Sequence, residues 1–264
     1  MANQKATAQE NMELEGFEEQ ELTIQSLPVL ALAQSQTPEV AEGETEGLKA
    51  GVLMNNVTKQ PLGESLELIV FKMWTGRTKF PPRGDNGPIE CWSPDNTTGI
   101  THGDCKTCAF ASFDMKDRCL EQNFFVVGLA DNPRELYRLI FAKSNKRTGE
   151  TLGKTLRIEC SKTQSPIYGV KILLTTKRVK NEKANAYYYV YEVKPSGMVE
   201  DAKLAELRPI FLELTELRKK SLEDFKAACE EAKSDSIGGE TEDEAVADTG
   251  EFKDFGTTEG DALL

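Results

Sequence analysis

Residues 169–194, GVKILLTTKRVKNEKANAYYYVYEVK, carry the pattern of a β-hairpin. Valine, isoleucine, leucine, threonine and tyrosine make up most of Gly169–Val179 and Ala186–Lys194. The segment Lys180–Asn185 between these runs is polar. Two runs of this kind around a polar tip predict two antiparallel strands joined by a turn.

Further strands are expected on the N-terminal side of this hairpin. Their residues lie at 51–55, 65–74, 123–130 and 136–143, and a turn at Asp131–Pro133 separates the last two. The apolar run Leu27–Ala33 is either an edge strand or a docking segment. Because these strands do not alternate with helices, parallel βαβ units are disfavoured. The sequence therefore predicts a mainly β (α+β) fold in the form of a small barrel.

Two segments outside the strands need an interpretation. Apolar residues recur every three or four positions along Asp201–Lys233, which predicts a helix, and Pro209 is expected to break it in two. Residues 149–155, GETLGKT, are one residue short of a phosphate-binding loop motif. We interpret that segment as a hairpin turn.

Charge is sorted along the 264-residue chain. The net charge is −9 for residues 1–48, +8 for 49–194, −2 for 195–233 and −9 for 234–264, which gives −12 in total. The segments predict an acidic disordered N-terminus (1–24), a binding domain (25–198), a helix (199–233) and an acidic disordered tail (234–264). A basic body between acidic arms indicates a polyanion-binding surface with its own competitors.

Composition also excludes several classes of protein. The N-terminus has no apolar core of a secretory signal, and no run approaches the ~18–20 apolar residues of a membrane span. A cytoplasmic protein without a membrane partner is expected. The single histidine, His102, leaves little room for Ser–His or Cys–His chemistry, so we expect no enzymatic activity.

Four of the six cysteines fall within 29 residues and form C-x13-C-x2-C-x10-C. They are Cys91, Cys105, Cys108 and Cys119. Tetrahedral zinc takes four such ligands, and a site with four protein ligands is structural because it keeps no open position. Two alternatives are four unlinked thiols or an iron–sulfur cluster, and His102 is a candidate to replace an outer cysteine. Cys160 and Cys229 are expected in the core.

Basic and aromatic residues cluster in the second half of the basic body, where Arg134 and Arg138 begin a basic stretch. The predicted DNA-binding residues are Lys143, Lys146, Arg147, Lys154, Arg157, Lys177, Arg178, Lys180, Tyr187, Tyr189, Tyr191 and Trp74. Rings stack on bases of any sequence, and cations track the phosphates. The alternative is that the tyrosine row is core and the charges are an ordinary solvated surface. Trp74 is equally suited to packing.

The chain resembles the single-stranded DNA-binding proteins of tailed bacteriophages. The likeness rests on Leu27–Gln34, an L-P-x-L-x-L-x-Q segment, on the cysteine-bearing loop 91–119 and on the acidic tail. It implies a five-stranded OB-like barrel, that is, an oligonucleotide/oligosaccharide-binding fold, with a zinc-stapled loop. It also implies a role in phage DNA replication or recombination, without strong sequence preference, in the host cytoplasm.

The same resemblance implies the partners. They are single-stranded DNA, replication or recombination proteins that contact the acidic tail, and further copies of the chain on DNA. One branch of these proteins binds zinc through a histidine and three cysteines, which leaves the role of His102 open. The alternative function is a zinc-containing adaptor that binds a replication, transcription or virion component through the cysteine loop and the helix 201–233.

Overall fold

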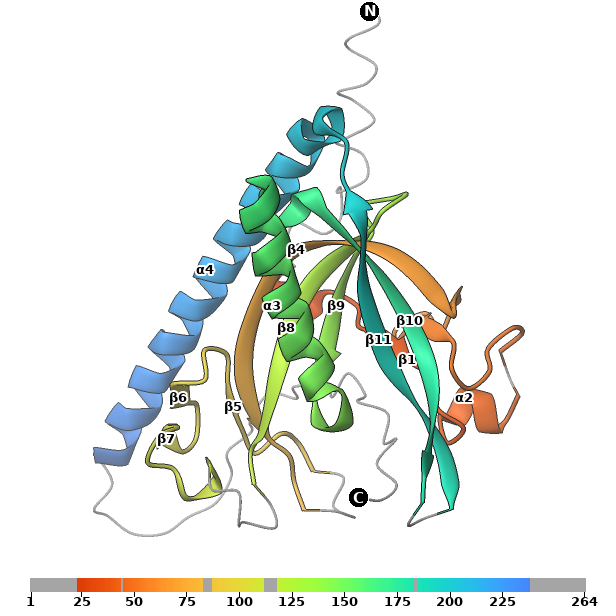
Figure 1. The fold of residues 1–264 in the computed structure, drawn as a ribbon. Helices are drawn as coiled ribbons and strands as arrows, with labels where there is room; N and C mark the ends of the chain where they lie inside the picture. Colours follow the sequence, from red (N-terminus) through yellow and green to blue (C-terminus); the bar gives the residue numbers. More distant parts are fainter. Residues whose placement is uncertain (1–22, 44, 83–86, 112–117, 183–184, 238–264) are drawn as a thin grey trace, which may run out of the picture.

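The computed structural model describes residues 23–237 except 44, 83–86, 112–117 and 183–184, and of residues 232–237 only the backbone is described. Most of the predicted acidic segments 1–24 and 234–264 therefore lies outside the described residues. The described part is mainly β with a few helices (Figure 1). The prediction of a mainly β, α+β fold is confirmed.

The main sheet is antiparallel, with the strand order β11-β10-β4-β8-β9. Its strands are β4 (Ser65–Lys79), β8 (Leu120–Leu129), β9 (Leu136–Phe141), β10 (Val170–Asn181) and β11 (Ala186–Met198). A short strand, β5 (Cys91–Ser93), pairs with the end of β4. The hairpin predicted from residues 169–194 is present as β10 and β11, and β11 extends four residues further.

A second, three-stranded sheet precedes the main one. It contains β1 (Leu30–Leu32), β2 (Leu53–Asn55) and β3 (Pro61–Gly63). Val29 forms a parallel bridge with Arg138 of β9. On the other side, the Gln34 side chain bonds both the backbone N–H and the carbonyl of Tyr189 in β11. The segment around β1 therefore contacts both outer strands of the main sheet.

The helix α3 (Lys146–Thr163) corrects the interpretation of residues 149–155 as a hairpin turn. Leu152 and Leu156 are buried in the main core, and Gly149 lies so close to β9 that an added Cβ would be 2.7 Å from the Cβ of Phe141. The two glycines and the polar residues of this segment favoured a turn. Its apolar positions nevertheless recur every four residues, which is the spacing of an amphipathic helix. The near-motif is therefore neither a hairpin turn nor a phosphate loop.

The helix α4 (Asp201–Ile237) is continuous, so the predicted break at Pro209 is wrong. Pro209 is exposed, whereas Leu207, Ile210 and Leu214 are buried against the sheet. A proline costs a helix one internal hydrogen bond, and packing on either side outweighs that cost here. None of the described helices is long and apolar enough to cross a bilayer.

The remaining elements are short. They are α2 (Pro38–Ala41), β6 (Thr98–Gly99), β7 (Gly103–Asp104), and the 3-10 turns η1 (Ile24–Ser26), η2 (Ala109–Ala111), η3 (Lys143–Asn145) and η4 (Ile167–Gly169).

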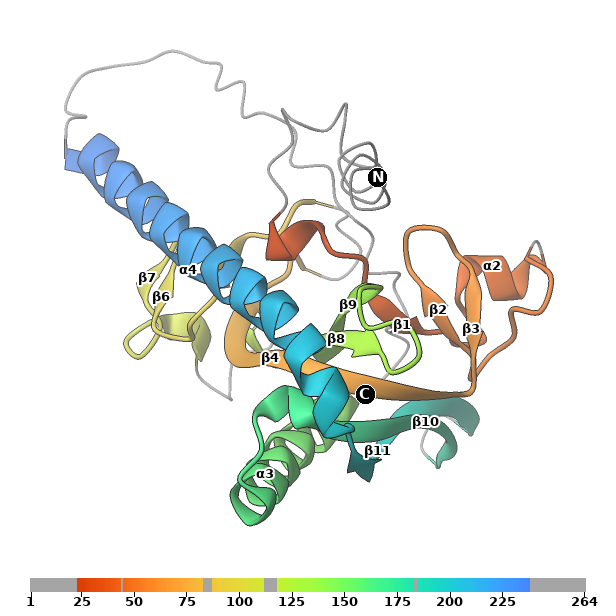
Figure 2. The same cartoon turned by 90° about the horizontal axis from the view of Figure 1, so that it is seen from above.

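Two hydrophobic cores lie on opposite faces of the main sheet. The first is formed by inward residues such as Leu68, Val127 and Leu139, and it is covered by α3 and β1. The second, with Phe71 and Val126, is covered by α4 and η1. Figure 2 shows β4 passing between α3 and α4. The sheet is therefore covered on both faces.

Candidate metal centre and nucleic-acid interface

The predicted zinc ligands come together in one cavity. Cys91 is on β5, Cys105 follows β7, Cys108 precedes η2 and Cys119 precedes β8, and all four line this cavity. We call residues 87–111 and 118–119, with the end of β4, the cysteine lobe. All four thiols are free, so no disulfide competes for them.

Two further residues shape the cavity. At Gly99, an added Cβ would lie 2.7 Å from the sulfur of Cys91, so only glycine leaves that sulfur room. Arg77 of β4 also lines the cavity, and its buried Nε has no hydrogen-bond partner among the described residues. Four thiolates around Zn²⁺ carry a net charge of −2, which a neighbouring guanidinium stabilises. The donor set, the glycine and the orphaned Nε all fit a zinc ion.

The electrostatics of the thiols indicate the same proximity. Burial and, to a smaller extent, the charges of Cys108, Cys91 and Cys105 raise the pKa of Cys119 to about 11. Burial also raises the pKa of Cys105, and Arg77 acts in the opposite direction on both. A bound metal ion would instead lower the pKa of these thiols, because a thiol that coordinates a metal loses its proton outright.

The sulfurs are not placed as a closed ligand set. Within the described residues, no three His, Cys, Asp or Glu side chains are arranged to hold a metal ion. His102 lines the same cavity but is exposed, and its ring lies 4.9 Å from that of Phe110. Cys160 packs against the first core from α3, and Cys229 is buried in α4.

The C-terminal half of α4 holds the cysteine lobe against the sheet, and it lies beside β6 and β7 in both Figures 1 and 2. The rings of Trp92 and Phe225 meet edge to face at 5.0 Å. Arg218 donates to the carbonyl of Pro94 at 2.6 Å, and its guanidinium lies 4.4 Å from the centre of the Trp74 ring. Burial lowers the pKa of Arg218 to about 10.

This packing involves Trp74, which was predicted either to bind DNA or to pack in the core. One face of its ring stacks on Phe124 at 5.5 Å, with only 9° between the planes. Arg218 lies over the ring as well. Trp74 is half-buried and packs against the second core, which is the packing role that the sequence left open for it.

The tyrosines of the predicted row differ in exposure along the hairpin. Tyr191 is 7% exposed and donates its hydroxyl to the carbonyl of Leu30, so it belongs to the core and not to a stacking surface. The ring of Tyr189 lies against Gly51, and an added Cβ there would be 2.5 Å from it. Tyr187 is 49% exposed, and the guanidinium of Arg178 lies 3.8 Å from its ring centre. Of the three, only Tyr187 offers an open ring.

The cations of the hairpin lie on two faces. Arg178 pairs across the strands with Tyr189, and Lys180 pairs with Tyr187, so these cations share the tyrosine face. Lys177 pairs with Val190 on the opposite face. Lys180 also forms an ion pair with Glu182 at 3.1 Å. The predicted group of Lys177, Arg178 and Lys180 is therefore not a single patch.

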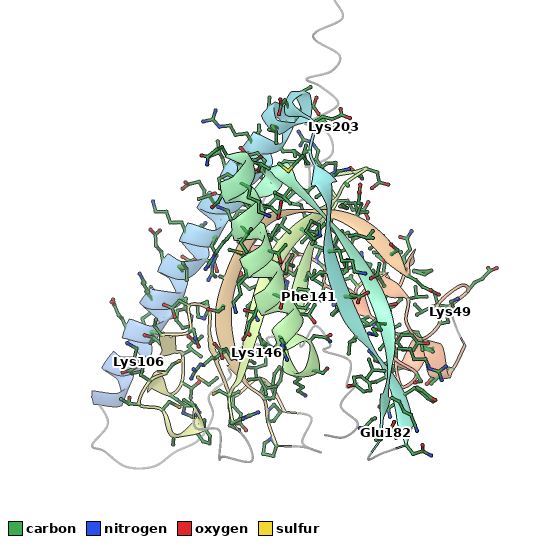
Figure 3. All side chains as sticks on the ribbon, in the orientation of Figure 1. Lys49, Lys106, Phe141, Lys146, Glu182 and Lys203 are labelled. Atoms are coloured by element: carbon green, nitrogen blue, oxygen red, sulfur yellow. The ribbon has the colours of Figure 1, made fainter. Side chains whose placement is uncertain are left out.

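The predicted cations of α3 lie at its start and along its outer side. Lys146 forms ion pairs with Glu121 and Glu150, and Lys143 lies in η3 immediately before the helix. Arg147, Lys154 and Arg157 are exposed. Thr148 and Asn145 bond the carbonyl and the N–H of Tyr191, which fixes the start of α3 against β11. Lys146 and Glu182, at the helix start and the hairpin tip, lie towards the same end of the view in Figure 3.

Arg77 was not among the residues predicted from the sequence, and Arg138 was named there only as part of a basic stretch. Arg77 lies 14 residues before the first clustered cysteine, and only the β4–β5 register, which pairs it with Ser93, brings it to the cavity. Arg138 occupies an outward position of β9, between the inward Tyr137 and Leu139. A cation at that position was visible in the alternating pattern, but its burial was not.

The fold and site define a mainly β protein with a cysteine-lined cavity and a projecting hairpin that carries cations. The chain belongs to the Pam3 phage gp34-like protein family, whose model matches residues 2–219. The family's name links the chain to a bacteriophage and names no activity or ligand. No curated protein and no solved structure matches the chain.

Proposed function

We propose that the chain is a single-stranded DNA-binding protein that acts in phage DNA replication or recombination. It would bind DNA through the hairpin tip, the start of α3 and the cysteine lobe. The observation that carries the proposal is the pair formed by Arg178 and the half-exposed Tyr187 at the tip of a projecting hairpin. An exposed ring stacks on a base of any sequence, and an arginine beside it contacts the phosphate.

The strand order supports an OB-like arrangement. With β4, β8, β9, β10 and β11 taken as strands one to five, the order is 5-4-1-2-3, and α3 joins strands three and four. OB-folds bind nucleic acid on the face of strands two and three and with the loops 1–2 and 4–5. Here loop 1–2 is the cysteine-bearing segment after β4, and loop 4–5 is the hairpin tip. Both predicted site regions therefore correspond to nucleic-acid-binding loops of that fold.

The barrel of this proposal is closed by the N-terminal segment. No strand pairing among the described residues joins β9 directly to β11, and the segment around β1 contacts both. On the outer face, α4 covers β4 and β8. We therefore propose that DNA runs along β9 and along the end of the molecule that carries loops 1–2 and 4–5, and not across the centre of β4 and β8.

Zinc is the structural part of the proposal. Cys91, Cys105, Cys108 and Cys119 would hold the ion, with Arg77 balancing its thiolate charge. A site with four protein ligands is structural, and its folding free energy would order a lobe that has few buried apolar residues. A stable lobe in turn fixes the loop that flanks the proposed DNA path.

The test is an electrophoretic shift of a labelled ~30-nucleotide single strand at low salt, with unlabelled duplex as competitor. The proposal expects a shift that excess duplex of the same length does not abolish. The absence of any shift in 50 mM salt would contradict the proposal and favour the protein-interaction adaptor.

A further inference from the structure

A cavity of about 70 Å³ lies beside β9 and shares no lining residue with the cysteine-lined cavity. A buried water needs roughly 10–15 Å³ by a comparable measure, so the cavity has room for a small polyatomic group. The residues that line it are Gln25, Ser26, Leu27, Asn56, Val57 and Arg138. None of them is acidic.

Arg138 is held in this cavity by the chain itself. Its backbone N–H donates to the carbonyl of Pro28 at 2.8 Å, and its side-chain Nε donates to the carbonyl of Leu27 at 3.0 Å. Among the described residues, its two terminal nitrogens have no hydrogen-bond or ion-pair partner. The hydrogen bond at Nε fixes the orientation of the guanidinium plane, and a fixed pair of terminal nitrogens suits bidentate recognition of an oxyanion.

Burial lowers the pKa of Arg138, and no carboxylate among the described residues offsets that effect. An arginine keeps its proton at neutral pH, so the protein holds a half-buried positive charge without a counter-ion among the described residues. Neighbouring Asn56 accepts a hydrogen bond from the Val29 N–H through Oδ1, which leaves its amide Nδ2 as a further donor. The cavity thus offers a fixed cation and an amide donor.

We propose that this cavity is an oxyanion site that takes one phosphate group, held by the Arg138 fork and the Asn56 amide. Arginine forks match the geometry of phosphate, and single-stranded DNA presents phosphates along its whole length. Arg138 faces outward from β9, the third strand of the proposed OB-like arrangement, where that fold meets nucleic acid. The assignment of this phosphate to a DNA backbone rests on the proposed function, whereas the oxyanion site does not.

The first arm of the test measures inorganic phosphate binding to the full-length protein by calorimetry, at an ionic strength held constant with chloride. Arg138→Lys keeps the charge but removes the fork and should weaken phosphate binding about tenfold. Val57 lines the cavity and is 54% exposed, so Val57→Glu places a competing carboxylate there without disturbing the core. Val57→Gln is its matched neutral control. Equal phosphate binding by Val57→Glu and Val57→Gln would overturn the site.

The second arm measures a thymidine 30-mer with the same variants. Val57→Glu should weaken its binding and lower the salt slope by about 0.7, the value for one phosphate contact on a single strand. If phosphate binding responds to Val57→Glu and oligonucleotide binding does not, free phosphate is the ligand and the DNA assignment is overturned. If no variant binds the oligonucleotide, the proposed function fails while the phosphate result still decides the site.

A third arm addresses the acidic N-terminus, because residues 15–21 include four glutamates immediately before η1. In a full-length variant these residues, Glu15, Glu18, Glu19 and Glu21, are changed to Gln. If phosphate binds this variant and not the wild type, a carboxylate of the chain occupies the cavity, and the phosphate proposal is overturned.

Discussion

Replacing Arg178 by Gln removes one exposed cation from the tyrosine face of the hairpin and leaves the hairpin core intact. If Arg178 contacts one phosphate, the salt slope of single-strand binding should fall by about 0.7. Between 50 and 200 mM salt, the affinity ratio of wild type to variant then changes about 2.6-fold. A fluorescence anisotropy titration of a labelled thymidine 30-mer at four or five salt concentrations resolves this difference.

The same hairpin provides the matched control. Lys177 is adjacent in sequence, carries the same charge and is exposed, but it pairs with Val190 on the opposite face. Lys177→Gln should leave the slope unchanged. Equal slopes for the two variants, whether both are lowered or both match wild type, would refute the assignment of DNA to the tyrosine face.

Stacking is tested at the neighbouring ring. Tyr187→Ala should cost about 1–3 kcal/mol of binding free energy at every salt concentration, because base stacking does not depend on counterion release. Tyr188, which pairs with Val179 on the other face, provides the control variant Tyr188→Ala. Because Arg178 lies over Tyr187, the double variant should lose less than the sum of the two single losses.

Three other predictions follow from the described contacts. Tyr191→Phe removes the buried hydrogen bond from the tyrosine hydroxyl to the carbonyl of Leu30. It should lower the unfolding free energy measured in urea by about 1 kcal/mol and leave single-strand affinity unchanged. A large loss of affinity would show that Tyr191 belongs to the binding surface. Protein purified under reducing conditions should contain about one zinc per chain by elemental analysis. The variant Cys108→Ser should lose this zinc, whereas Cys160→Ser on α3 should retain it. Equal zinc content in the two variants would contradict the cysteine-lobe site. Ending the chain at Ile237 removes one base and nine acids, and it should tighten single-strand binding at low salt with a gain that shrinks as salt rises; unchanged affinity would show that the tail does not compete.

The strands were predictable because their patterns are local. Alternation along residues 65–74 is enough to predict one strand, and the two runs around Lys180–Asn185 are enough to predict a strand pair. Residues 146–163 mislead the same reasoning. Gly149 favours a turn by propensity, yet it is the residue that lets α3 approach Phe141. Tertiary contact decided that segment, and a single sequence does not show it.

Some features of the candidate site were likewise predictable from local sequence, and others were not. The spacing of the four cysteines was enough to predict that they gather, and they do line one cavity. The fate of the tyrosine row was not predictable, because Tyr187 and Tyr191 have the same pattern and differ only in how far each lies from the core. Arg77 reaches the cysteines through the strand register, which no local spacing reveals.

The central claim is that a single strand binds at the hairpin tip, the start of α3 and the cysteine lobe. Ultraviolet cross-linking of a bromodeoxyuridine-substituted 30-mer, followed by mass spectrometry of the peptides, tests it most directly. The account predicts cross-links at Tyr187 and in peptides from the start of α3 or the cysteine lobe. Cross-links confined to the outer face of α4, or none at saturating protein, would contradict it.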